Sequence, residues 1–132
     1  MNLLLGGAAS LAAIGVFWHG VGGEVGIVRR LDPETLAPSF FGDGDITKRF
    51  LRACWHLFTV VLVASSAVLF WLAQAPPGPA TIAVSRLVAA EFAGFLVVYL
   101  VVAVGRPVLF VRAPQWLFFS AVAALAWMGG AG

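Results

Sequence analysis

The sequence has few charged residues and a single cysteine. Eight Lys or Arg and six Asp or Glu are spread over 132 residues, so that 11% of the chain is charged. Soluble domains carry roughly 25% charged residues, and a chain with so few cannot cover its apolar surface in water. Cys54 is the only cysteine, which excludes an internal disulfide and any chemistry that needs two thiols in one chain.

Apolar residues make up most of what is present. They account for 61% of the sequence, the mean hydropathy is +0.99, and they are gathered in long runs. This composition predicts an integral membrane protein whose main partner is the lipid bilayer. The net charge of +2 and the pI near 9.3 do not indicate nucleic-acid binding, because the basic residues flank apolar runs and share a connection with acids.

Four apolar runs are long enough to cross a bilayer, which takes about 20 helical residues. They cover about residues 3–23, 50–73, 82–104 and 113–129. We expect the first run to be retained rather than cleaved as a signal peptide, because no Lys or Arg precedes it. The predicted fold class is an all-α membrane protein, in which residues 1–132 form a single domain of four transmembrane helices in an up-down bundle.

The distribution of basic residues predicts the orientation of this bundle. The connection between the second and third runs contains no Lys or Arg, whereas the other two connections contain Arg29, Arg30, Lys48, Arg49, Arg52, Arg106 and Arg112. Cytoplasmic loops of membrane proteins carry an excess of Lys and Arg. We therefore expect a multi-pass protein of the cell's inner membrane, with the charged first loop in the cytoplasm and both termini outside.

Most charges lie in one stretch. Ten of the fourteen charged residues lie from Glu24 to Arg52, where the first two runs end and begin. Each of these two ends carries a Trp-His pair, Trp18-His19 and Trp55-His56, and an antiparallel hairpin would bring both pairs to a similar depth. Asp45 is predicted to be the N-cap of the second helix, where its carboxylate would accept backbone N–H bonds.

Polar residues of the second run share one helical face. Arg52, His56, Thr59, Val63 and Ser66 recur at spacings of four and three, which places them on the same side of an α-helix. We expect this polar seam to point at a neighbouring helix. Its simplest role is interhelical hydrogen bonding, which contributes roughly 0.6 kcal/mol per pair in membranes.

The first run has a face of small residues on the side of His19. Counting back from His19 by four and three gives Gly15, Ala12, Ala8 and Leu5, and Gly22 with Gly26 adds a Gly-x-x-x-Gly pair. Such faces suit close helix packing. His19 and Glu24 lie five residues apart, about 140° around a continuous α-helix, so they can share a site only if the helix unwinds at Gly22-Gly23.

Glu91 is the acid placed deepest in an apolar run. It lies about 12 Å beyond the expected start of the third helix at about 1.5 Å per residue. A lone carboxylate at that depth costs a few kcal/mol unless it is protonated, paired or hydrated. The candidate partners are Arg86, Ser65 and Ser66.

Three functions remain open at this point. The first is a subunit of an ion-, proton- or metal-coupled transporter or channel that acts as a homo-oligomer or in a larger membrane complex, because four short helices enclose little water. A divalent metal would then be held by His19, His56 and Glu24, and the groups of the proton or ion relay would be Glu91, Arg52, Ser66 and Thr59. Imidazole and carboxylate side chains suit this role because they can exchange protons near neutral pH.

The second function is electron transfer by a b-type haem with His19 and His56 as axial ligands. The third is a non-catalytic accessory or assembly subunit that uses the small-residue face and the uncharged fourth run as contact surfaces. An enzyme is less favoured, because a catalytic metal site usually needs three protein ligands and an open position. Only the two histidines with Glu24 or Glu91 would supply such a set.

Overall fold

The computed structural model describes residues 1–131, and nearly all of them are helical. No β-strand occurs among these residues; the only bridge found in them pairs Ser39 with Gly42. Three helical segments are long and apolar enough to cross a membrane: Leu3–Arg30, Gly44–Gln74 and Pro79–Ala103. The sequence-based prediction of an all-α protein with membrane-spanning helices is confirmed to this extent.

The first segment is not a uniform α-helix. It begins as α1 (Leu3–Phe17), continues as the π-helical segment η1 (Trp18–Gly23) and the short α2 (Glu24–Gly26), and ends in the 3-10 turn η2 (Val28–Arg30). Three of its six π-helical residues are glycines, which lack the side chains that stabilise a regular α-helix in an apolar segment. The helix changes from α to π at the first Trp-His pair. The pattern of apolar residues did not predict this change.

The loop after η2 contains the 3-10 turn η3 (Pro33–Thr35) and leads into the long helix α3 (Gly44–Gln74). The predicted N-cap at Asp45 is wrong. The carboxylate of Asp43 accepts the backbone N–H groups of Asp45 and Ile46, both at 3.1 Å, whereas Asp45 pairs with Arg49 one turn further on at 2.7 Å. The helix therefore starts two residues earlier than an Asp45 cap allows, because Gly44 fits where any side chain would collide with the carbonyl of Pro33.

The remaining helices are α4 (Pro79–Ala103), the short α5 (Val108–Arg112) and α6 (Gln115–Ala131). The breaks between these helices coincide with Pro and Gly residues of the sequence, and Gly105, two residues after the end of α4, adopts a φ of +73°. With 17 residues, α6 is about 26 Å long at about 1.5 Å per residue, slightly less than the roughly 30 Å of a bilayer core. A fourth crossing therefore stays a prediction.

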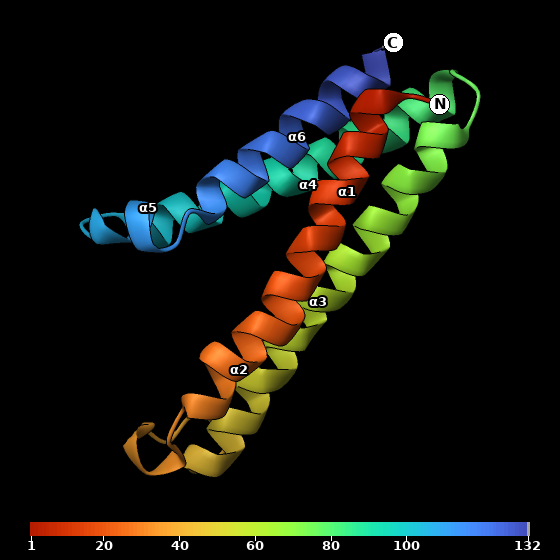
Figure 1. Ribbon diagram of the computed structural model, residues 1–132. Coiled ribbons are helices and arrows are strands. Elements are labelled where there is room, and N and C mark those ends of the chain that lie inside the picture. Colours follow the sequence, from red (N-terminus) through yellow and green to blue (C-terminus); the bar gives the residue numbers. More distant parts are fainter. Residues whose placement is uncertain (132) are drawn as a thin grey trace. The chain divides into compact units, whose positions relative to one another are not determined.

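The chain divides into two compact units. The hairpin unit comprises residues 13–64, and the paired-helix unit comprises residues 1–12 together with 65–131. In the paired-helix unit α4 and α6 lie side by side along their length (Figure 1), with Phe92 fully buried among Phe95, Phe118 and Phe119. Two close approaches hold this unit together, because a side chain at Gly130 would collide with Ser85 and one at Gly129 would meet Leu5.

The small-residue face of α1 is buried as predicted. Leu5, Ala8 and Ala12 have no exposed surface, and Gly15 is buried as well. Large apolar side chains elsewhere on the helices are exposed, among them Ile14, Leu57, Val60, Phe70 and Val98. Buried small residues and exposed large ones are the pattern of helices whose outer surfaces face lipid.

Candidate functional site

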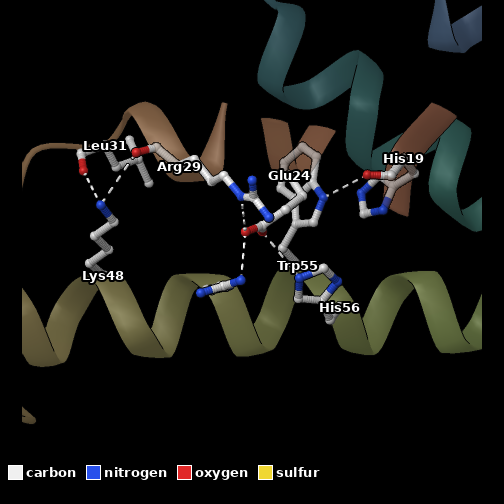
Figure 2. A network of polar contacts seen from close by, with 8 residues as sticks. His19, Glu24, Arg29, Leu31, Lys48, Trp55 and His56 are labelled. Carbon is white, nitrogen blue, oxygen red and sulfur yellow. Dashed lines mark hydrogen bonds and ion pairs between the residues drawn. The ribbon is translucent and has the colours of Figure 1, made fainter. Parts of the chain in front are cut away.

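A buried carboxylate lies at the centre of the hairpin unit. Glu24 is only 7% exposed, and its Oε1 accepts Arg52 Nη2 at 2.7 Å and Arg29 Nε at 3.4 Å. Its other oxygen, Oε2, lies 3.2 Å from His56 Nε2. Figure 2 shows this carboxylate between Arg29 of η2 and His56 of α3. Two helical segments are thus joined through one acid with three cationic or titratable partners.

Lys48 extends this network, because it binds the backbone of Arg29 and of the neighbouring Leu31. Its ammonium group donates to the carbonyl oxygens of Leu31 at 2.5 Å and Arg29 at 3.5 Å (Figure 2). These carbonyls lie at the end of η2, where the helix leaves acceptors without intrahelical partners. Lys48 therefore fixes the exit of the first segment against α3 instead of pairing with an acid.

The polar seam of α3 points at the first helical segment, as predicted. Arg52 and His56 reach Glu24, Thr59 reaches His19, and Ser66 donates to the carbonyl of Ala9 at 3.0 Å. The first three contacts lie in the hairpin unit and the last lies in the paired-helix unit.

His19 is held on three sides by α3. Its ring stacks on the indole of Trp55 with centroids 4.2 Å apart and planes 7° apart, and Phe58 meets it edge-on at 4.8 Å. Its Nδ1 lies 3.0 Å from the hydroxyl of Thr59, and Trp55 Nε1 donates to the His19 carbonyl at 2.9 Å. The imidazole is therefore fixed in position and rotation.

The partners assign opposite tautomers to the neutral forms of the two histidines. Thr59 Oγ1 lies 3.0 Å from His19 Nδ1 and 3.4 Å from the Trp55 carbonyl oxygen, and when the hydroxyl donates to that carbonyl it can only accept from Nδ1–H of His19, which leaves the lone pair on Nε2. In His56, Nε2 faces a carboxylate that can only accept, so Nε2 carries the proton. Each ring thus has one nitrogen committed to a protein partner and a second one left for other chemistry.

The π-helical turn brings His19 and Glu24 to the same partner helix. Hydrogen bonds in a π-helix run from residue i to i+5, so residues five apart lie close to one face instead of 140° apart. The helix does not unwind at Gly22-Gly23 but widens into a π-helix over Trp18–Gly23. Gly20 and Gly23 make it possible, since a Cβ at Gly23 would collide with the Trp55 ring and one at Gly20 would lie 3.0 Å from Thr59 Cγ2.

The predicted Gly22 and Gly26 pair takes no part in the contact between the first segment and α3, because a Cβ at either position would meet nothing within 4 Å. The sequence also left out Arg29 and Trp55 as members of the site. The repeated Trp-His pair was a signal for Trp55, but the pair was used only to predict that both histidines lie at a similar depth. Arg29 carried no signal beyond its positive charge in the loop.

His19, His56 and Glu24 do not form a compact set of three ligands. No group of three or more His, Cys, Asp or Glu residues suited to a metal ion occurs in the described part of the chain. The two rings have different partners: His19 lies against Trp55 and Thr59, and His56 lies against Glu24. The geometry therefore lends no support to the haem pair or the metal site, which stay predictions.

Glu91 lies in the paired-helix unit, on α4. Its Oε2 accepts the hydroxyl of Ser65 at 3.0 Å, and Ser65 is 5% exposed. The other two candidate partners are engaged elsewhere, since the Arg86 guanidinium lies 5.0 Å from the centre of the Trp127 ring and Ser66 binds Ala9. Ser65 is a neutral partner. Its hydrogen bond therefore does not neutralise the charge of an ionised Glu91 carboxylate.

Comparisons with known proteins add no relatives to this description. No protein-family model, curated protein or solved structure matches the chain.

Proposed function

We propose that this chain is a proton-coupled transport or channel subunit of the inner membrane, with Glu24 and His56 as the groups that bind and release the proton. The observation that supports this most directly is a buried carboxylate in contact with a histidine near one end of a helical segment that is long and apolar enough to cross a membrane. Ionisable residues within membrane spans are costly, and they commonly mark ion or proton pathways. A Glu-His pair can take up one proton without a large movement of either side chain.

The broken first segment supports the same proposal. Transporters form their ion sites where a membrane helix is interrupted, because the loosened backbone and adjacent side chains can coordinate the ion. Here the interruption at η1 directly precedes Glu24. Arg52 and Arg29 pair with the same carboxylate, at 2.7 and 3.4 Å, and hold it against α3.

The proposed membrane arrangement is the four-helix up-down bundle, with the loop at residues 31–43 in the cytoplasm and both termini outside. The Glu24 network then lies near the cytoplasmic ends of the first two helices. Glu91, which accepts a hydrogen bond from Ser65, provides a second carboxyl group within the spans. Since four helices enclose little water, the transport unit is proposed to be an oligomer of this chain.

The test is proton flux in vesicles that contain the purified chain. A pH-sensitive dye enclosed in liposomes reports how fast an imposed pH difference decays, with a potassium diffusion potential to balance charge. We expect the chain to accelerate the decay several-fold over protein-free vesicles. The variants Glu24→Gln and His56→Gln should abolish the acceleration, because Gln keeps a hydrogen-bonding group in place and cannot titrate.

Arg49→Gln provides the matched control. Arg49 also forms an ion pair on α3, but with the exposed Asp45 and outside the Glu24 network. Its flux should equal that of the unaltered chain. A rate no higher than in protein-free vesicles, or a rate that Glu24→Gln leaves unchanged, would show that the Glu24 network has another purpose, such as fixing the hairpin of an accessory subunit.

A further inference from the structure

The loop before α3 ends in a tight turn that exposes two phenylalanines. Backbone hydrogen bonds join Ser39 N to Gly42 O at 2.9 Å and Gly42 N to Ser39 O at 3.1 Å, so Phe40 and Phe41 occupy the two central positions. Phe40 is 99% exposed and Phe41 is 58% exposed. We call residues 39–42 the phenylalanine turn.

The phenylalanine turn is held in place by its own contacts. The hydroxyl of Ser39 accepts the Phe41 N–H at 3.3 Å. Gly42 has a φ of +146°, and a side chain there would lie 2.6 Å from Ile46 Cδ1, so the turn packs directly against the first turn of α3. The exposure of Phe40 therefore results from a defined conformation.

The two rings form an aromatic chain that reaches α3 at Phe50. Phe41 stacks on Phe50 with centroids 4.7 Å apart, and Phe40 meets Phe41 edge-on at 5.7 Å. Phe50 lies about 9 Å from the start of α3 at about 1.5 Å per residue. No Asp, Glu, Lys or Arg occurs between Arg52 and the end of α3 at Gln74. The aromatic stack therefore ends close to the level beyond which α3 carries no Asp, Glu, Lys or Arg.

We infer that the phenylalanine turn is a lipid-binding anchor, in which the Phe40 ring inserts between the headgroups and acyl chains of the bilayer that α3 crosses. Its apolar surface is continuous with that of Phe50 and Leu51, which are 46% and 43% exposed. Aromatic side chains concentrate at this boundary of the membrane. The inference depends on α3 crossing a membrane and is independent of proton transfer at Glu24.

Site-specific fluorescence tests this contact in the full chain. Because Cys54 is the only cysteine, a Cys54→Ser background allows one labelling position at a time. Phe40→Cys is labelled with the environment-sensitive dye NBD and reconstituted in phosphatidylcholine vesicles. We expect blue-shifted emission, quenching by lipids with a nitroxide near the headgroup end of the acyl chain, and several-fold weaker quenching by aqueous iodide than at a loop control.

Ala37→Cys is that control, since Ala37 is an exposed residue of the same loop outside the phenylalanine turn. Leu57→Cys, on the exposed side of α3, provides the reference for a lipid-facing position. Equal iodide quenching at positions 37 and 40 would overturn the inference. Blue-shifted emission at position 40 without lipid quenching would also overturn it, because it would mean that a protein surface covers the turn.

Discussion

At the scale of single residues, Thr59 determines which nitrogen of His19 carries the proton. Its hydroxyl donates to the Trp55 carbonyl and accepts from His19 Nδ1, and it contacts His19 only because Gly20 allows the helices to approach. A hydroxyl that is fixed by a backbone acceptor has only lone pairs to offer, so it selects one tautomer of its partner. His19 Nε2 thereby stays an unprotonated base while the ring is neutral.

Thr59→Val should release this selection. The variant keeps the shape of the side chain and removes the hydroxyl, and we expect both neutral tautomers of His19 to be populated. The lost hydrogen bond should cost about 0.6–1 kcal/mol of stability. Nitrogen-15 NMR of labelled histidine distinguishes the tautomers by chemical shift. Thr59→Ser should keep the Nδ1–H form, and a single Nδ1–H form in Thr59→Val would show that another group orients the ring.

At the scale of elements, two glycines of η1 form the contact with α3 and two neighbouring glycines do not. A methyl group at Gly23 would collide with the Trp55 ring, whereas one at Gly22 or Gly26 would meet no atom within 4 Å. The contact therefore depends on Gly20 and Gly23, three residues apart, because the π-helical turn changes which positions face α3.

Substitution by alanine should lower the stability of the chain at a glycine that contacts α3 and should not lower it at a glycine that does not. Gly23→Ala should destabilise the chain by about 1–3 kcal/mol through overpacking against Trp55. Gly22→Ala should leave stability unchanged or raise it by up to about 1 kcal/mol, since alanine favours a helix over glycine. Reversible unfolding in mixed detergent micelles measures both. Equal losses in the two variants would contradict the contact between Gly23 and Trp55.

Hydropathy was sufficient to predict the helices, and local spacing was sufficient to predict the polar seam and the buried face of α1. Both depend on the α-helical period, which holds over most of each segment. The period fails at Trp18, where the π-helical turn is stabilised by contacts with Trp55 and Thr59 that lie some forty residues away along the chain. The sequence analysis grouped His19, His56 and Glu24, and for the same reason it could not predict that His56 contacts Glu24 while His19 packs against Trp55 and Thr59. The sequence did not identify Asp43 as the N-cap of α3, because Asp43 and Asp45 have the same side chain. The close approach of Gly44 to the Pro33 carbonyl, which lies earlier in the loop, distinguishes the two positions.

At the scale of the whole molecule, the open question is how often the chain crosses the membrane. Three helices are long and apolar enough, and α6 is slightly shorter than a bilayer core. All basic residues except Arg86 of α4 lie in or beside the first and third connections, with none between Gln74 and Pro79. A crossing by α6 would leave its C-terminal end on the same side as that uncharged turn, and both would lie outside the cell.

Single cysteines in the Cys54→Ser background test this arrangement with a membrane-impermeant maleimide. Gly78→Cys and Ala131→Cys should react in intact cells, because the uncharged turn and the end of α6 are predicted to face outward. Ala37→Cys and Arg106→Cys should react only after the membrane is permeabilised, because they lie in the connections that carry the basic residues. If Ala131→Cys reacts only after permeabilisation while Gly78→Cys reacts in intact cells, α6 lies on the cytoplasmic side and the chain crosses three times. Thinning of the bilayer would then not be needed to accommodate a helix of 17 residues, and α6 would be held by its contacts with α4 and with Leu5 of α1.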